Sequence, residues 1–169
     1  MNYNYITRQK IINNFVEIVT EFCALIDQQE AIEPHQFIKQ ISKILAKLYA
    51  AVMELINIIP DEQEIIENFK ITEGVPKVYQ GIQSKLGQYN FYWEVFNPLE
   101  EDEAVVGDLR DDLRDIYRDI KEGFVAFERG HVNYAIWHWK FHFIVHWGDH
   151  LVDALRVLHR INSNHLNTD

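Results

Sequence analysis

Hydrophobic residues recur at intervals of three and four along most of the chain, which is the period of an amphipathic α-helix. The pattern runs through residues 11–26 and again through residues 37–59. Pro34 suits the first turn of the second helix, where a backbone amide would have no helical partner, and Pro60 marks its end. The pattern therefore predicts two long helices in the N-terminal part of the chain.

Shorter segments occupy the middle of the chain. Asp61 followed by Glu64 has the form of a capping box and predicts a short third helix through Phe69. We expect a fourth helix over about residues 76–86. A cluster of aromatic residues follows it, namely Tyr89, Phe91, Tyr92, Trp93 and Phe96. An acidic loop then spans residues 99–104, and no alternating run of β-branched residues predicts a strand.

The last two helices are predicted to be long, over about residues 108–128 and 132–160. Gly130 lies between them, and glycine enters the left-handed conformation that ends a helix at little cost. A short connection makes two such helices antiparallel neighbours. The sequence thus predicts an all-α, single-domain helical bundle of about five to six helices over residues 1–169. Residues 1–88 form its N-terminal helices, and the last two helices form a long antiparallel hairpin.

Composition narrows the possible function classes. The chain has 169 residues, of which 47% are hydrophobic, and a net charge of −10. That apolar fraction excludes intrinsic disorder, and the single cysteine, Cys23, excludes a disulfide scaffold. Because an acidic chain is repelled by phosphate groups, we expect no nucleic-acid partner.

No segment resembles a targeting or membrane element. The first five residues lack the apolar core of a signal peptide. The longest apolar stretch, residues 38–59, contains three lysines and a glutamate, which a membrane span would not tolerate. We therefore expect a cytoplasmic protein that does not bind membranes.

Aspartates form a stripe along the predicted helix of residues 108–128. Asp112, Asp115 and Asp119 follow one another at helical spacing, beside a second stripe of arginines and a lysine. The ordinary interpretation is a solvated face with ion pairs between residues three and four apart. Asp112 also suits a helix N-terminus. Asp115 and Asp119 lie beyond the first turn, so the favourable interaction of an anion with the helix N-terminus does not explain them.

The final predicted helix carries a histidine at every fourth position, namely His138, His142, His146 and His150. Each step of four residues turns about 40° around the helix, so the histidines form a gently spiralling ridge. Bulky apolar residues such as Trp139 and Trp147 lie on the opposite arc, and we expect the tryptophans to belong to the core. The alternative is a groove lined by tryptophans that binds a partner helix or a ligand. The ridge should therefore be a narrow polar seam rather than an open face.

When the chain reverses at Gly130, a residue that precedes the turn by a given number of positions comes to lie beside the residue that follows it by the same number. The expected pairs are His142 with Asp119, His146 with Asp115, and His150 with Asp112. Two histidines four residues apart, with a carboxylate from the neighbouring helix, are typical ligands of a divalent metal such as zinc, iron, nickel or copper. The candidate ligands are His142, His146, His150, Asp115 and Asp119. The alternatives are a seam of histidine–aspartate hydrogen bonds and a surface that titrates near neutral pH.

The C-terminal half resembles a known family. The elements that carry the likeness are Tyr92-Trp93-Glu94-Val95-Phe96-Asn97-Pro98, Asp111-Asp112-Leu113-Arg114-Asp115-Ile116, Trp137, Trp139, Phe141, Trp147-Gly148 and Ala154-Leu155-Arg156. Their order and spacing over about residues 89–161 are similar to those of the bacterial domain-of-unknown-function family 5063. The resemblance implies a helical bacterial domain without an assigned activity. The family pattern rests on the tryptophans, the Trp-Gly step and the aspartates, and the histidine ridge is not part of it.

Two hypotheses for the function follow from these patterns. The first is a non-catalytic cytoplasmic interaction or accessory module that binds a protein partner. Its candidate surface consists of Asp112, Asp115, Asp119, Trp147 and Gly148. The second is a metal-binding helix-bundle protein, in its enzymatic form a metal-dependent hydrolase, that uses the seam of histidines and aspartates. The metal content of the protein separates the two hypotheses.

Overall fold

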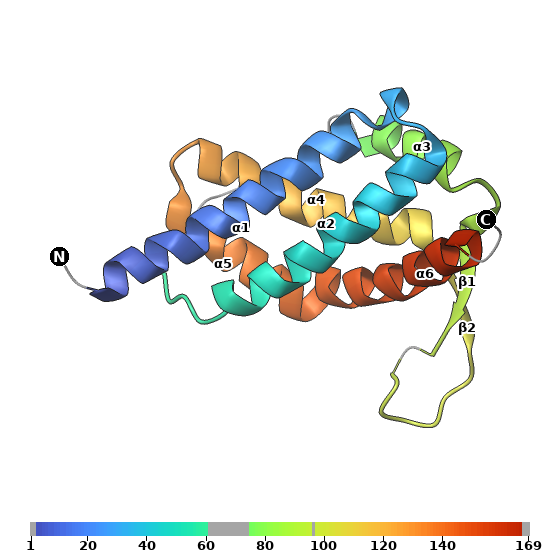
Figure 1. Cartoon of the computed structure of the whole chain (residues 1–169). Coiled ribbons are helices and arrows are strands. Elements are labelled where there is room, and N and C mark those ends of the chain that lie inside the picture. The colour runs from blue at the N-terminus through green and yellow to red at the C-terminus, as the bar shows by residue number, and fades with distance from the viewer. Residues whose placement is uncertain (1–2, 61–74, 96, 167–169) are drawn as a thin grey trace.

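Long helices make up most of the computed structural model, which describes residues 3–60, 75–95 and 97–166. In chain order the elements are α1 (Tyr3–Asp27), η1 (Gln29–Ala31), α2 (Pro34–Leu55), α3 (Val75–Leu86), η2 (Gly87–Tyr89), β1 (Phe91–Glu94), β2 (Val105–Asp108), α4 (Leu109–Glu128), α5 (Val132–His142), η3 (Phe143–Trp147) and α6 (Gly148–Leu166). Figure 1 shows the long helices side by side in a bundle, with the hairpin of β1 and β2 projecting from one end. The predicted helical bundle is therefore confirmed.

α1 and α2 form the two N-terminal rods and pack against each other. Pro34 occupies the first turn of α2, as its missing amide hydrogen leads us to expect. α2 ends at Leu55, before the predicted end at residue 59, because the amides of Asn57 and Ile58 bond three residues back in tighter turns. The third helix predicted from Asp61 onwards lies outside the described residues.

α4 lies at the centre of the bundle and packs against α1, α3, α5 and α6. Asp108 caps its N-terminus, because the side chain accepts hydrogen bonds from the amides of Arg110 and Asp111. After the helix ends, the chain reverses at Gly130, whose φ of +89° favours glycine. As predicted, this short turn makes α4 and α5 antiparallel neighbours (Figure 1).

α5, η3 and α6 form one continuous helix with a π-helical turn, η3, in its middle. In this turn the amide of Gly148 donates to the carbonyl of Phe143, five residues earlier instead of four. A Cβ atom at Gly148 would collide with that carbonyl oxygen, so the turn closes only around a glycine. The long final helix is present as predicted, but it is not regular α-helix throughout and it extends beyond residue 160.

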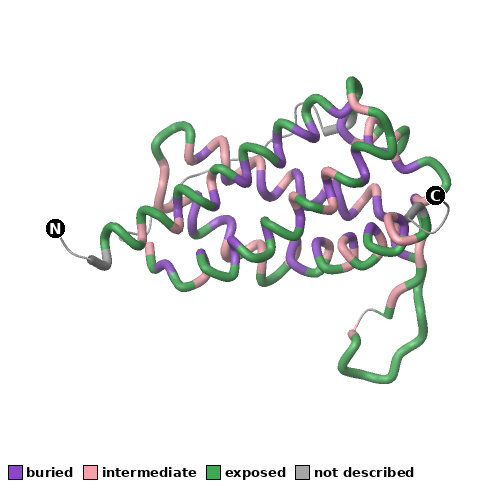
Figure 2. Tube along the Cα trace, in the orientation of Figure 1, coloured by how far each residue is buried: buried purple, intermediate pink, exposed green. Residues whose placement is uncertain are grey.

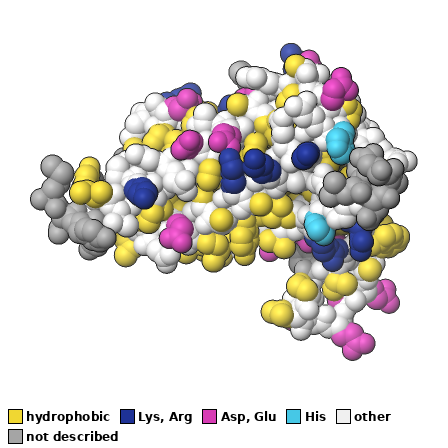
Figure 3. All heavy atoms as spheres, in the orientation of Figure 1, with side chains coloured by type: hydrophobic (Ala, Val, Ile, Leu, Met, Phe, Trp, Pro, Cys, Tyr) yellow, Lys and Arg dark blue, Asp and Glu magenta, His cyan; other side chains and the backbone are white. Residues whose placement is uncertain are grey.

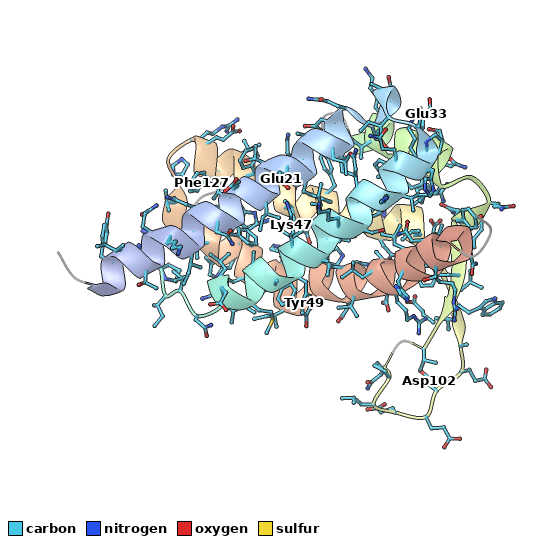
Figure 4. The ribbon with its side chains drawn as sticks, viewed as in Figure 1. Glu21, Glu33, Lys47, Tyr49, Asp102 and Phe127 are labelled. Carbon is cyan, nitrogen blue, oxygen red and sulfur yellow. The ribbon has the colours of Figure 1, made fainter. Side chains whose placement is uncertain are left out.

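A two-stranded antiparallel hairpin of β1 and β2 is the feature that the sequence patterns do not predict. Tyr92 is paired with Gly107, and Trp93 with Val106. The ring of Tyr92 fills the space that a Cβ atom of Gly107 would need, so the glycine lets this ring lie across β2. The acidic loop between the strands, with Asp102, extends away from the bundle (Figure 4).

The core follows the inner faces of the helices along the whole bundle (Figure 2). Trp139 and Trp147 are fully buried, and their indole nitrogens donate to the backbone carbonyls of Ile120 and Trp139. Trp93 and Trp137 are 68% and 42% exposed. The prediction that the tryptophans belong to the core is therefore confirmed for two of them and wrong for these two, which lie on the hairpin and on the outer side of α5.

Exposed hydrophobic side chains form a band along one edge of the bundle. Figure 3 shows them over the C-terminal half of α2 and the neighbouring part of the C-terminal helix. Tyr49 and Met53 of α2 are exposed, as are Ile144 and Val145 of η3. Tyr49 packs edge-on against Phe143, which joins the two parts of the band. Among the described helices, none is both long enough and apolar enough to cross a membrane.

Candidate functional site

A polar seam runs between α4 and the C-terminal helix. It consists of Asp112, Asp115 and Asp119 on α4 and His142, His146 and His150 on the facing helix. The aspartates are 6%, 9% and 2% exposed, whereas the side chains of the histidines are 30%, 33% and 31% exposed. The seam therefore buries its acidic side and opens its histidine side to solvent.

Asp119 contacts two of the histidines. Its Oδ2 lies 2.6 Å from Nδ1 of His146 and 3.6 Å from Nδ1 of His142. Burial acts to raise the pKa of Asp119, but the interactions with the two histidines outweigh burial and hold that pKa below its ordinary value. Asp119 is therefore a carboxylate at neutral pH and accepts a hydrogen bond from His146.

Asp112 contacts the third histidine and connects the seam to the hairpin. Its Oδ1 lies 2.9 Å from Nδ1 of His150, and its Oδ2 accepts a hydrogen bond of 2.7 Å from the hydroxyl of Tyr92 on β1. The hydrogen bond to Asp112 raises the pKa of His150, although partial burial opposes it. Burial also raises the pKa of Asp112, more than its hydrogen bonds lower it. Both shifts favour a proton held between Asp112 and His150.

Asp115 lies between the other two aspartates and contacts arginines of its own helix. Arg114 and Arg118 each place a guanidinium nitrogen 3.2 Å from its Oδ1, and Arg114 also reaches Oδ2 at 3.3 Å. The same Oδ2 lies 3.9 Å from Nε2 of His150. One carboxylate oxygen of Asp115 and one ring nitrogen each of His146 and His150 lie within 4.8 Å of one another. These three side chains are close enough together to hold a metal ion.

His138, the first histidine of the predicted ridge, belongs to the core instead. It is 2% exposed, and its Nε2 lies 3.0 Å from the backbone carbonyl of Asp119, to which it donates a hydrogen bond. Burial, together with the neighbouring His142, lowers the pKa of His138 to about 4. This histidine is therefore neutral at physiological pH and stabilises the contact between α4 and α5.

The structure places two of the three expected pairs side by side. His142 lies beside Asp119, and His150 lies beside Asp112. His146 differs, because it forms its hydrogen bond with Asp119 while remaining within reach of Asp115. His146 lies within the π-helical turn, where the regular helical spacing from which the pairs are counted does not hold. Of the five candidate ligands, the structure brings together His146, His150 and Asp115, and leaves His142 and Asp119 as a neighbouring pair.

The residues that the sequence assigns to an interaction surface lie inside the bundle. Trp147 is fully buried, and Gly148 has no room for a side chain. The three aspartates are also buried, because α4 is the central helix and its acidic stripe faces the C-terminal helix instead of solvent. The candidate interaction residues therefore lie in an enclosed seam.

Three further polar residues extend the seam toward the hairpin. The hydroxyl of Tyr92 lies 3.2 Å from Oε2 of Glu94. Burial and a hydrogen bond with Glu94 raise the pKa of Asp153 to about 7. Asp153 follows His150 by three residues on the polar side of the same helix, and this spacing could have identified Asp153 as a seam residue from the sequence. Tyr92 and Glu94 carry no such signal, because only the pairing of β1 with β2 brings them here.

Comparisons with known proteins agree with this architecture. Residues 7–164 match the family described as Domain of unknown function (DUF5063). The structure is similar to the crystal structure of protein BF1032 from Bacteroides fragilis, with a TM-score of 0.77 and 26% sequence identity over 90% of this chain and 92% of that chain. No curated protein matches the chain. The family match begins in α1, so the likeness covers the N-terminal helices as well as residues 89–161, and the chain belongs to the DUF5063 family.

Proposed function

We propose that this protein binds one divalent transition-metal ion in the seam, through Nε2 of His146, Nε2 of His150 and a carboxylate oxygen of Asp115. The observation that carries the proposal is the convergence of one ring nitrogen each of His146 and His150 and one carboxylate oxygen of Asp115 within 4.8 Å of one another. Two imidazoles and one carboxylate form a ligand set typical of zinc, iron and other first-row transition metals.

The hydrogen bonds around the histidines support this assignment of ligand atoms. Nδ1 of His146 donates to Asp119 and Nδ1 of His150 donates to Asp112, so Nε2 of each neutral ring carries the free lone pair. Metal-binding histidines usually donate their other ring hydrogen to a carboxylate or carbonyl, which fixes the ring and makes the free nitrogen more basic. Asp119 and Asp112 are thus positioning residues in this proposal.

The distances require only a small adjustment to fit an ion. Two nitrogen or oxygen ligands that are each about 2.1 Å from one zinc ion lie no more than about 4.2 Å apart. Nε2 of His150 and Oδ2 of Asp115 already meet that limit at 3.9 Å. A small shift of the partly exposed ring of His146 that keeps its hydrogen bond to Asp119 brings in the third ligand, and the open histidine side of the seam gives the ion a route from solvent.

A site of this composition also suggests a reaction class. Three protein ligands leave a coordination position for water, whose pKa a divalent ion lowers, and this is the chemistry of metal-dependent hydrolases. His142 is not among the three ligands and interacts with the same carboxylate as His146, so it is the imidazole available to accept a proton. Hydrolysis is therefore the activity that we propose to test once metal binding is established.

The decisive experiment is metal content, measured by mass spectrometry on tag-free protein purified without chelator and after incubation with Zn²⁺, Fe²⁺ or Mn²⁺. We expect about one ion per chain. His146→Ala removes a ligand and should abolish uptake, whereas Asp119→Asn keeps the ligands but loosens His146 and should weaken affinity about 10–100-fold. Affinity should also fall in acid, because protonation of His150, with its raised pKa, competes with the ion.

His35→Ala is the matched control, because it removes an exposed histidine at the start of α2, on a different helix from the seam histidines. This variant should take up the metal as the wild type does. Thermal unfolding of all variants without metal distinguishes a lost ligand from a lost fold. The proposal is overturned if the wild-type protein holds no metal after incubation, or if wild type and His146→Ala take up equal amounts of metal.

A further inference from the structure

A pocket lies between the hairpin and the C-terminal part of α6, and it shares only Tyr92 with the seam and its extension. Its volume is about 590 Å³, which is within the range of small-molecule sites. Phe91 and Trp93 of β1 line one side, and Arg156, Val157 and Arg160 of α6 line the other. Arg156 donates a hydrogen bond of 2.7 Å to the backbone carbonyl of Trp93, so the two walls are tied together.

Positive charge gathers in this pocket although the chain carries a net charge of −10. Arg156 and Arg160 bring the charge and His159 lines the pocket beside them, whereas no aspartate or glutamate lines it among the described residues. Tyr92 also lines the pocket, whereas Glu94 at the end of β1 is hydrogen-bonded with Asp153 and is not among the lining residues. The fold thus keeps carboxylates out of one site in an acidic protein, and this site favours an anion.

Exposed aromatic rings provide the second recognition element. Phe91 and Trp93 are 67% and 68% exposed and share one face of β1, since alternate residues of a strand do so. Two residues of a strand span about 7 Å, which is twice the contact distance of about 3.5 Å between stacked rings. A planar ring stacked at that distance on each side chain would occupy the space between them. Neither the core nor the seam accounts for such exposed rings.

We propose that this pocket binds a nucleoside monophosphate, with the base stacked against Trp93 and Phe91 and the phosphate paired with Arg160 and His159. Base stacking on aromatic side chains tolerates any base, and arginine forms charge-assisted hydrogen bonds with phosphate. The proposal does not rest on the metal site, because the residues of the pocket and the three metal ligands are different.

Isothermal titration calorimetry of the full chain with adenosine 5′-monophosphate tests this proposal, in the presence of a chelator so that the seam holds no metal. We expect adenosine and inorganic phosphate each to bind at least tenfold more weakly than the monophosphate. Arg160→Ala should weaken binding of the monophosphate about tenfold and leave adenosine unchanged. Trp93→Ala should weaken both about tenfold. Lys10→Ala, which removes an exposed cation on α1, should change neither.

Several results would overturn the proposal. No heat of binding with the monophosphate at millimolar concentration, or equal affinity in wild type and both pocket variants, would show that the pocket is not the site. Phosphate binding as tightly as the nucleotide would show a simple anion site without base recognition. A ten-base single strand that binds far more tightly than the monophosphate would point to a nucleic acid instead. Circular dichroism of each variant confirms that its fold is retained.

Discussion

The contact of α1 with α2 and the contact of α4 with the C-terminal helix bury different kinds of side chain. α1 and α2 contribute fully buried apolar residues such as Phe22 and Leu45. Their ion pair, Glu21 with Lys47, lies at the surface, with both side chains 42% exposed (Figure 4). α4 and the C-terminal helix instead enclose aspartates with histidines, and Asp119 is only 2% exposed.

This difference bears on the proposed metal site. Burying a carboxylate costs free energy that hydrogen bonds at best recover, and apolar side chains in the same place are often as stabilising or more so. Apolar packing of the kind seen in α1 and α2 is sufficient to hold helices together. We therefore take the buried aspartates as support for the proposed metal site, whereas the contact of α1 with α2 needs no ligand to explain it.

The largest combined effect on stability and on the seam is expected from Gly148→Ala. The new methyl group would collide with the carbonyl of Phe143, so the π-helical turn could not keep its geometry. Overpacking of this kind lowers the free energy of unfolding by about 1–3 kcal/mol. Loss of the turn also rotates His146 relative to His150, so metal uptake should fall as well. Urea unfolding and metal analysis of the same sample measure the two effects.

Two control variants show which effect belongs to which region. Leu45→Ala leaves a cavity in α2 and should cost about 2–5 kcal/mol, yet the folded protein should take up metal normally. Gly87→Ala makes the same chemical change at the start of η2, where φ is +55° and a Cβ atom would meet none of the described residues within 4 Å, and should cost about 1–2 kcal/mol. If Gly148→Ala unfolds and takes up metal as the wild type does, the turn does not position the histidines.

Long helices could be predicted from the sequence because their apolar period repeats many times. α1, α2, α4 and the C-terminal helix each carry several turns of the same signal, and Gly130 marks the one reversal between the last two. The contact between histidines and aspartates was predictable for the same reason, because the positions of both are counted along regular helices from the reversal at Gly130. Which oxygen meets which nitrogen was not predictable, because this depends on the local geometry of η3.

The π-helical turn and the hairpin escaped prediction for different physical reasons. Gly148 in the middle of a helix costs about 1 kcal/mol relative to alanine, so it signals a packing constraint, but it does not say which one. The strands of the hairpin are four residues long, too short to show a periodic pattern. Their place is set by contacts that span distant parts of the chain, such as Tyr92 with Asp112 and Arg156 with Trp93.

Asp153 tests the seam at its hairpin end with a smaller effect, which depends on pH. Its pKa is raised to about 7 by burial and by the hydrogen bond with Glu94, from about 3.9 in an unfolded chain. Folding therefore favours its protonated form, and this stabilisation is fully present below about pH 4 and is lost as the pH rises through 7. Asp112 and Glu94 act to raise this pKa, and Arg156 acts to lower it.

Asp153→Asn keeps a hydrogen-bonding group beside Glu94 but removes the titration. Its unfolding temperature should therefore fall less than that of the wild type between pH 5 and pH 8, and it should be the more stable protein at pH 8. Thermal unfolding at each pH measures the two slopes. Asp149→Asn, an exposed position on the same helix, is the matched control. Identical slopes for wild type and Asp153→Asn would show that Asp153 and Glu94 do not share a proton.

The smallest effect is expected at the surface ion pair between α1 and α2. Nζ of Lys47 lies 2.8 Å from Oε2 of Glu21, and both side chains are well solvated. Exposed pairs contribute about 0.2–1 kcal/mol and are screened by salt. A double-mutant cycle with Lys47→Ala and Glu21→Ala, followed by urea unfolding, should give a coupling in that range that shrinks at high salt. A coupling above about 2 kcal/mol would contradict the contrast drawn between the two helix contacts. Polar contacts would then stabilise α1 against α2 as well, and the polar seam would need no ligand to explain it.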